Sequence, residues 1–381
     1  MQSSQQKKIA VLGVPAVDVV LQFSRFPGPG EHQSLTGLET TPGGPACNIA
    51  TALARLGARV HIYGKVGRDI YGGKIIEDME EEGIKLTDPL DPEIDTTTTV
   101  FNLVEQTAEG KEKSQRSFSR FGAGDPSEIG ESIDASTGDF DLIFLDGIAA
   151  MAKRTFQGVM DLADNLAGKE GKKRPAKSSM LACNPNLRIG EELPPVIESR
   201  MAEIFSRCQL LVMNEKEAYL LSGISGADLE SDSNLESDSD LEKNADLESD
   251  IEVKSKNEGK KERIAMRKAV VEKAAERLLA EYPGVQQLVI TRGRKGAFLI
   301  SAVERDNSVF LEASSTEAVD TSGAGDVFTA ALMLARLEGK SLKEAGLFAG
   351  DAAARVVSRP GAWSAIPDRQ QFQQLRNTIT K

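Results

Sequence analysis

Short apolar runs that alternate with helix-patterned segments are the feature that most limits how this chain can fold. Their order predicts a mostly parallel β-sheet covered by helices on both faces, which is an α/β fold. With 381 residues and 40% hydrophobic content, the chain suits one large α/β domain with an appendage, or two domains. The apolar runs lie at residues 8–14, 60–64, 142–145, 180–183, 210–213, 288–291 and 297–300.

Two stretches lack the helical period and predict a second, smaller sheet. Residues 19–42 contain β-like pieces and turn signals. Residues 96–121 have the pattern of a β-hairpin, because two β-rich runs flank a polar turn around Gly110. Together these stretches predict a small sheet that projects from the main body.

Residues 226–262 interrupt the alternation with acidic six-residue repeats. High charge with little apolar mass cannot offset the entropy of ordering, so we expect a disordered surface loop. A calcium-binding repeat is the alternative, but the repeats lack the glycines that such turns need. Residues 228–252 hold eleven acidic residues and one lysine, out of a net charge of −12. The rest of the chain is only mildly acidic, which predicts no nucleic-acid partner.

Cysteine and histidine are scarce. Cys47, Cys183 and Cys208 lie far apart, and only His32 and His61 could join them in a metal site. Sparse cysteine suits a reducing compartment. The amino terminus is polar and leads directly into a strand, and no apolar run reaches membrane-spanning length. We therefore expect a cytoplasmic protein without a membrane partner.

The loop at residues 320–326 carries the clearest chemical signal. Gly323 and Gly325 leave its backbone bare, and a buried helix is predicted to begin there. A helix start presents unpaired N–H groups, which suit a phosphate or a developing anion. Asp326 would be a general base beside that anion. The alternative is an Asp-rich helix cap next to a flexible turn.

Other phosphate-binding patterns are absent from the sequence: neither GxxxxGK[ST] nor GxGxxG occurs. What recurs instead is a polar residue just past the end of a predicted strand. Each one alone could be a cap or turn residue. Their recurrence predicts a ligand site at the carboxyl edge of the sheet. The residues are Asp18, Asn48, Asp146, Asn184, Arg188, Asn214, Glu217 and Asp326.

Four motifs in the sequence are characteristic of a known family. They are residues 42–50 with 56–72, residues 214–217 as an NxxE motif, residues 291–293, and residues 320–326. With these motifs the sequence resembles the ribokinase-like sugar kinases of the PfkB carbohydrate kinase family. The resemblance implies one ribokinase-like domain over residues 1–381. That domain would be a three-layer sandwich with a mostly parallel sheet and a small β-sheet lid from about 19–42 and 96–121.

The resemblance implies a role for each matching residue in an ATP- and Mg²⁺-dependent transfer to a primary hydroxyl of a sugar. Asp326 would be the base, and the backbone of Gly323, Ala324 and Gly325 would form the anion hole. The sugar-binding residues would be Asp18, Gly43, Gly44 and Asn48. The nucleotide-binding residues would be Asn214, Thr291 and Gly293. Glu217 and Asn214 would hold Mg²⁺ through water, and Asp320 and Ser322 would contact K⁺, although Pro360 and Ala365 depart from the ribokinase pattern.

Two arginines bear on the choice of sugar. Residues 184–188 resemble the DPNLR segment of the fructokinase and 2-keto-3-deoxygluconate kinase branch, with Asn184 in place of Asp. Arg188 and Arg120 match arginines of that branch and would suit a substrate carboxylate. Alternatively, they tie the lid to the body. The favoured substrate is fructose or 2-keto-3-deoxygluconate, and the alternative substrate is ribose or a nucleoside. The alternative function of another class is that of a non-catalytic sugar sensor. Family lids also pair subunits, which predicts a homodimer.

Overall fold

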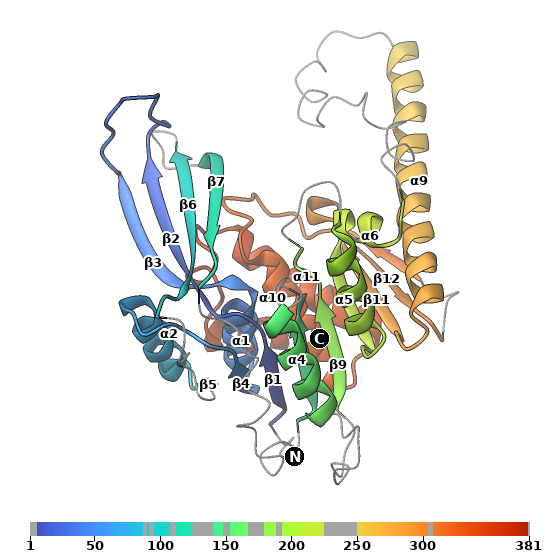
Figure 1. Ribbon diagram of the computed structural model, residues 1–381. Helices are drawn as coiled ribbons and strands as arrows, with labels where there is room; N and C mark the ends of the chain where they lie inside the picture. Colours follow the sequence, from blue (N-terminus) through green and yellow to red (C-terminus); the bar gives the residue numbers. More distant parts are fainter. Residues whose placement is uncertain are drawn as a thin grey trace.

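The computed structural model describes residues 6–86, 90, 95–106, 112–122, 140–147, 153–166, 179–187, 193–224, 250–303 and 308–379. Its centre is a nine-stranded sheet (Figure 1). The strands pair in parallel except at one side, where β12 pairs antiparallel with both of its neighbours, β11 and β13. In spatial order they are β13 (Val309–Leu311), β12 (Ala297–Ser301), β11 (Gln287–Thr291), β10 (Leu210–Asn214), β9 (Met180–Asn184), β8 (Leu142–Asp146), β1 (Lys8–Leu12), β4 (Arg59–Tyr63) and β5 (Lys85–Leu86).

Helices cover both faces of this sheet and bury two separate hydrophobic cores. Side chains alternate along each strand, so Ile9 and Val11 join one core and Ala10 and Leu12 the other. The first core contains α1 (Gly44–Arg55), α2 (Ile70–Glu81), α10 (Ala324–Leu337), α11 (Leu342–Val357) and α12 (Arg369–Ile379). The second contains α4 (Lys153–Leu166), α5 (Pro195–Phe205), α6 (Glu215–Leu221) and α9 (Asp250–Glu281). The predicted α/β sandwich is thereby confirmed.

A four-stranded sheet projects from the body beside α2 (Figure 1). We call it the lid sheet. Its strands, in spatial order, are β3 (Gly37–Gly43), β2 (Ala16–Phe23), β6 (Thr98–Gln106) and β7 (Glu112–Arg120). β6 and β7 pair antiparallel, as the hairpin pattern predicts, and β2 pairs with β6 in parallel.

Asp69 fastens the root of the lid sheet to the body. It caps α2, where its Oδ1 accepts the Gly72 N–H at 2.8 Å. Its Oδ2 accepts the Thr97 N–H at 2.8 Å, and its Oδ1 also accepts the Thr97 hydroxyl at 2.6 Å. Because Thr97 directly precedes β6, one carboxylate holds both a body helix and a lid strand.

The structure differs from the expected loop over residues 226–262 at its carboxyl end, where α9 begins at Asp250. High charge argues against a packed core, but Lys and Glu are also good helix formers, and Glu252 precedes Lys256 by the helical spacing of four. The short strands β5 and β13 were not predicted, because two or three residues cannot display a period. Residues 225–249 lie outside the described part.

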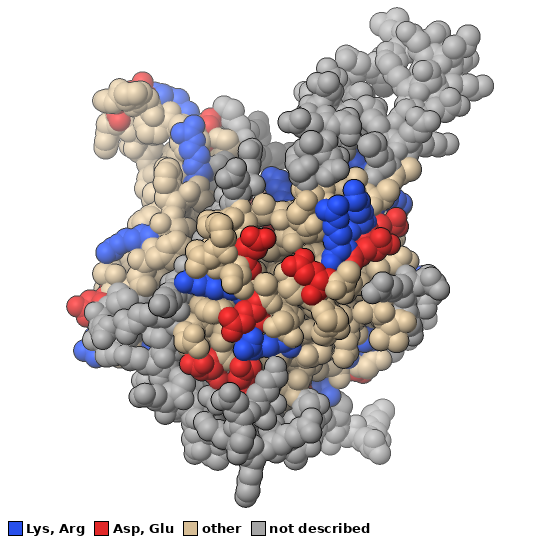
Figure 2. Space-filling model, turned by 45° about the vertical axis from the view of Figure 1, so that its right-hand side comes forward, with Lys and Arg blue, Asp and Glu red and all other residues tan. Residues whose placement is uncertain are grey.

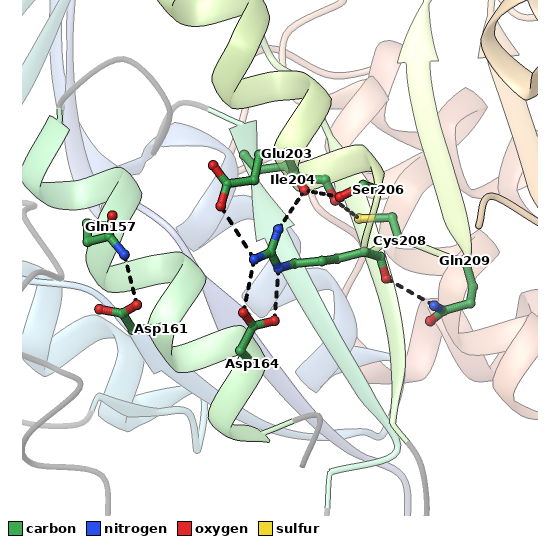
Figure 3. A network of polar contacts seen from close by, with 9 residues as sticks. Gln157, Asp161, Asp164, Glu203, Ile204, Ser206, Cys208 and Gln209 are labelled. Carbon is green, nitrogen blue, oxygen red and sulfur yellow. Dashed lines mark hydrogen bonds and ion pairs between the residues drawn. The ribbon is translucent and has the colours of Figure 1, made fainter. Parts of the chain in front are cut away.

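An ion network joins the segments at the amino edge of the sheet (Figure 3). Arg207, just before β10, donates from Nε and Nη2 to the two carboxylate oxygens of Asp164 at 2.8 and 3.0 Å. Glu203 lies 3.4 Å from the same guanidinium. Gln209 donates to the Arg207 carbonyl at 3.0 Å and accepts the Leu181 N–H at 2.8 Å. This edge therefore links α4, α5, β9 and β10.

The outer surface of the body mixes both signs of charge. Figure 2 shows basic and acidic side chains next to one another over this face. Among the described residues, the helices are too short or too polar to cross a lipid bilayer.

Candidate active site

A cleft of about 260 Å³ lies between the lid sheet and the loop that leads into α10. Alternate residues of β2 and β6 form its lid wall, and residues 360–364 close it from the body. It brings together seven of the residues predicted from sequence: Asp18, Gly44, Asn48, Asp320, Ser322, Gly323 and Asp326.

Asp326 and Asn48 meet in this cleft from two helices that begin at the same edge of the sheet. Asn48 lies in the first two turns of α1 and Asp326 in the first turn of α10, 278 residues apart. The Asn48 Nδ2 donates to Asp326 Oδ2 at 2.8 Å. This contact fixes the orientation of the carboxylate predicted to act as the base.

The other polar atom of the Asn48 side chain is unsatisfied. Asn48 is only 4% exposed, and its Oδ1 has no hydrogen-bond partner among the described residues. A buried acceptor without a partner costs about 1–3 kcal/mol. Asn48 also lines the cleft, so a ligand bound there would lie next to this side chain.

Two glycines let the backbone of α1 approach the lid strand β2. A Cβ on Gly43 would lie 2.2 Å from the carboxylate carbon of Asp18, so only glycine leaves room for that side chain. Gly44 has φ +72°, in the left-handed region that favours glycine. Both glycines therefore shape the position of Asp18 in the cleft. The neighbouring Cys47 is fully buried, and this burial raises the pKa of its thiol to about 12, which disfavours the thiolate.

The start of α10 has the features of an anion site. Gly323, with φ +74°, forms the turn into the helix, and no described side chain caps the first turn. The position of a Cβ on Gly325 is open, with no atom within 4 Å. The backbone amides at this helix start are thus accessible to an anion placed beside Asp326.

Asp320 joins the two loops that flank this helix start. Its Oδ1 accepts the Ser322 N–H and its Oδ2 accepts the Gly361 N–H, both at 2.8 Å. The carboxylate therefore acts here as a clamp between residues 320–322 and the loop at 360–364.

The residues predicted to bind the nucleotide gather at the carboxyl ends of β10 and β11, outside the walls of the cleft. Asn214 and Thr291 are register partners at the ends of these two strands. Gly293, with φ +56°, follows two residues later. Their shared edge confirms that they lie close together; their binding of a nucleotide stays a prediction.

Glu217 binds backbone amides with both carboxylate oxygens. Oε1 accepts the Leu187 N–H and Oε2 the Asn214 N–H, each at 2.8 Å, and the Asn214 side chain caps α6 in return. Glu217 is buried, and this burial raises its pKa although both amides oppose the shift. Two of its acceptor positions thus bind the backbone, and the contact of this carboxylate with Mg²⁺ through water stays a prediction. The described residues contain no group of three or more His, Cys, Asp or Glu that could hold a metal.

Comparison with known proteins identifies the family. A model of the "pfkB family carbohydrate kinase" matches residues 6–244 and 247–369. The chain belongs to the PfkB family of carbohydrate kinases. It is thus a kinase, a phosphotransferase with an alcohol group as acceptor. The resemblance to PfkB kinases that the sequence motifs indicate is confirmed.

Several ribokinases are similar to this PfkB kinase over nearly its whole length. A ribokinase from Haemophilus influenzae is 26% identical over 374 residues, covering 96% of this chain and 97% of its own. The crystal structure of a ribokinase from Thermotoga maritima is 26% identical, with a TM-score of 0.65 and coverage of 98% and 100%. A putative ribokinase II from E. coli, solved with ATP and Mg²⁺, has a TM-score of 0.69 at 17% identity and shows the shared fold. These relatives do not specify the fructokinase branch that residues 184–188 suggest.

The structure does not bring Arg120 to the cleft of this PfkB kinase. Arg120 is exposed on β7 and pairs with Thr99, whereas Ser117 pairs with Asn102 and faces the cleft. Residues three apart on a strand face opposite sides, so Arg120 lies on the outer face of the lid sheet. Arg188 lies outside the described residues.

Sequence reasoning missed most of the lid wall. Glu39 and Thr41 of β3, and Asn102 of β6, line the cleft of this kinase with uncharged or acidic groups. The signal that could have identified them is register: Thr41 lies opposite Asp18, and Glu39 and Asn102 flank the next inward residue of β2, Val20. That register follows from strand pairing, which a single sequence does not display.

Proposed function

We propose that this PfkB-family kinase transfers the γ-phosphoryl group of ATP to a primary hydroxyl of a small, uncharged sugar. One observation carries the proposal: the carboxylate-bearing residues Asp326 and Asp18 and the uncapped start of α10 line one cleft. A base, a hydroxyl-binding acceptor and an anion site are the three elements that phosphoryl transfer to an alcohol requires.

Each of these residues has a defined task in the proposed reaction. The Asn48 amide holds Asp326 Oδ2, which orients the carboxylate to take a proton from the sugar hydroxyl. Asp18 and the Asn48 Oδ1 accept hydrogen bonds from other sugar hydroxyls. The amides of Gly323, Ala324 and Gly325 stabilise charge on the transferred group. Mg²⁺-ATP, when bound, supplies that group and neutralises part of its charge.

The charge of the cleft supports an uncharged sugar over a keto acid. Asp18, Glu39, Asp320 and Asp326 line it, whereas no Lys or Arg does so among the residues that the structure describes. A substrate carboxylate would meet repulsion there, and Arg120 faces away. Because the full-length relatives include ribokinases, ribose is the first candidate and fructose the second.

A coupled assay of ADP release tests the proposal directly. We expect ADP release when ribose or fructose is the acceptor. With 2-keto-3-deoxygluconate or a nucleoside as the acceptor, we expect little or no ADP release. Trp363, the one tryptophan of the chain, lies between the cleft residues Ala362 and Ser364 in sequence, so a change in its fluorescence on addition of sugar would measure binding independently of turnover. Sugar binding without ADP release would instead support the non-catalytic sensor.

The proposed cofactors have separate tests. Mg²⁺ would be held through water near Glu217, so chelation should abolish turnover but leave sugar binding intact. Both oxygens of Asp320 already accept backbone amides, so a K⁺ ion would rely mainly on backbone carbonyls of the adjoining loops. Rates in potassium and in tetramethylammonium buffers would measure that dependence. The cytoplasmic location and the absence of nucleic-acid and membrane partners stay predictions.

We also propose a homodimer through the outer face of the lid sheet. Two rows opposite the cleft are largely apolar: Leu38, Leu21 and Leu103 lie in one, which ends at Arg116, and Val19, Phe101 and Phe118 lie in the next, which begins at Thr40. Leu38 is 65% and Phe118 58% exposed, which is unusual for such large apolar side chains in adjoining rows.

Light scattering would test this dimer. The double variant Leu38→Ser, Phe118→Ser should halve the measured mass. The matched control is Val303→Ser, which removes an apolar group that is 85% exposed on the body, and should leave the mass unchanged. A monomeric wild-type protein would refute the dimer.

A further inference from the structure

A buried chain of hydrogen bonds connects the end of β9 to the first turn of α10. Asn184 Nδ2 donates to Thr329 Oγ1 at 3.2 Å, and the Thr329 hydroxyl donates to the Gly325 carbonyl at 2.8 Å. Asn184 is 8% and Thr329 1% exposed, so water does not compete for these groups. A hydroxyl has one hydrogen, and Thr329 uses it on Gly325, so Asn184 must be the donor in the first bond.

The orientation of the Asn184 amide is fixed by a second contact. Its Oδ1 accepts the N–H of Asn186 at 3.2 Å, which leaves its NH₂ group for Thr329. Asn186 has φ +47°, an uncommon value for a residue other than glycine, and its side chain donates to Asp146 Oδ1 at 3.1 Å. A strained loop held at several points is typical of a functional site.

The far end of this chain contacts the backbone between the predicted anion hole and the predicted base. The carbonyl of Gly325 and the N–H of Asp326 belong to one peptide group. Glycine has the freest backbone, and nothing packs where a Cβ of Gly325 would lie. The Thr329 hydroxyl therefore adds a bond to a carbonyl in the first turn of α10, where no side chain restrains Gly325. A bond to the carbonyl also polarises the peptide and strengthens its N–H as a donor.

We propose that Asn184 and Thr329 are positioning residues that hold the Gly325–Asp326 peptide, which joins the predicted anion hole to the predicted base. Asn184 belongs to the loop whose Leu187 N–H is bound by Glu217. The chain thus runs from the predicted nucleotide edge to the predicted base. The catalytic part of this inference rests on the proposed kinase function. The restraint on the helix start does not.

Thr329→Val tests the proposal because it removes the hydroxyl and keeps the shape. We expect kcat to fall about tenfold, less than the loss of a direct anion-hole donor, with little change in the KM for sugar. Thr329→Ser should recover most of the rate. The matched control is Ser222→Ala, which removes a buried hydroxyl that bonds to the Tyr219 carbonyl on α6. A wild-type kcat in Thr329→Val, or equal loss in Thr329→Ser, would overturn the proposal.

Asn184→Asp provides a second test that keeps the size of the side chain. An ionised carboxylate cannot donate to Thr329, but a protonated one can. We expect kcat relative to wild type to rise as the pH falls, a dependence that a merely structural role would not produce. A constant ratio across the pH range would contradict the inference.

Hydrogen exchange separates this inference from the kinase proposal. In Thr329→Val, the amides of residues 327–329, the first in α10 with carbonyl partners within the helix, should exchange faster than in wild type, while the remainder of α10 is unchanged. This holds even if no sugar is phosphorylated, in which case the proposed function fails alone. Unchanged exchange at 327–329 would refute the restraint itself.

Discussion

The two edges of the central sheet use polar side chains in opposite ways. At the amino edge, Arg207 binds Asp164 with two hydrogen bonds (Figure 3), and the Gln209 side chain both donates to the Arg207 carbonyl and accepts the Leu181 N–H. At the carboxyl edge, Asn48 keeps a buried oxygen without a partner, and Asn186 adopts a strained backbone. The amino edge is arranged for stability. The carboxyl edge gives up local stability for groups that a ligand can complete.

Asp326→Asn should produce the largest effect. It should also separate the two edges most clearly, because a change at the carboxyl edge should reduce activity and leave stability unchanged. An amide cannot take a proton, so we expect kcat to fall about 10²–10⁴-fold. Thermal unfolding should be nearly unchanged, since the side chain lies at the cleft rather than in a core. Steady-state ADP release with the preferred sugar measures the loss, and Trp363 fluorescence should still report sugar binding. A near wild-type kcat would remove Asp326 from its assigned role.

Asn48→Leu should uncouple function from stability. The variant loses the contact to Asp326 and the acceptor for a sugar hydroxyl, so kcat/KM should fall by the equivalent of about 2 kcal/mol or more. Without sugar, its unfolding temperature should change little, because removal of a buried unsatisfied oxygen offsets the loss of the hydrogen bond to Asp326. A clear loss of stability in the unliganded variant would show that this oxygen is satisfied in solution.

Arg207→Met should show the reverse behaviour. Asp164 raises the pKa of Arg207 through their hydrogen bonds, and both side chains are partly buried. Breaking the pair should lower the free energy of unfolding by about 1–2 kcal/mol, between the values for exposed and buried pairs. Urea denaturation measures this change, and kcat should be unaffected. A double variant with Asp164→Leu would show how much of the loss comes from the carboxylate left unpaired.

Asp69 should give the smallest effect and sharpens the comparison, because it is a satisfied carboxylate near the carboxyl edge. Burial acts to raise its pKa, but hydrogen bonds from Thr97 and Gly72 outweigh this and lower it below the ordinary 3.8. The stability that it adds is therefore present above pH 3.8 and is lost as the pH falls through the lower folded value.

Asp69→Asn should thus cost less than about 1 kcal/mol at neutral pH, as for other helix caps. The difference from wild type should shrink below pH 3.8, as followed by thermal unfolding in acid. A difference that grows in acid would contradict the assigned sign.

Much of the fold follows from local patterns. The apolar runs at 142–145, 180–183 and 210–213 became β8, β9 and β10, because a buried parallel strand needs only a short apolar segment. The segment 250–262 could not be assigned in this way, since its charge suits either a solvated loop or a solvated helix. Similarly, local patterns could place the site at an edge of the sheet, but they could not identify the lid residues that form one wall of the cleft.

The amino-acid sequence by itself determined the order of strands and helices, the glycine-rich helix start and the candidate base Asp326. Those features depend on neighbours a few residues apart, through the helical and strand periods and the backbone freedom of glycine. The tertiary structure alone decided that Asn48 donates a hydrogen bond to Asp326, that Thr329 accepts one from Asn184, and that Arg120 faces away from the cleft. Such contacts depend on which edges meet and on strand register, where a shift of one residue reverses the face of every side chain.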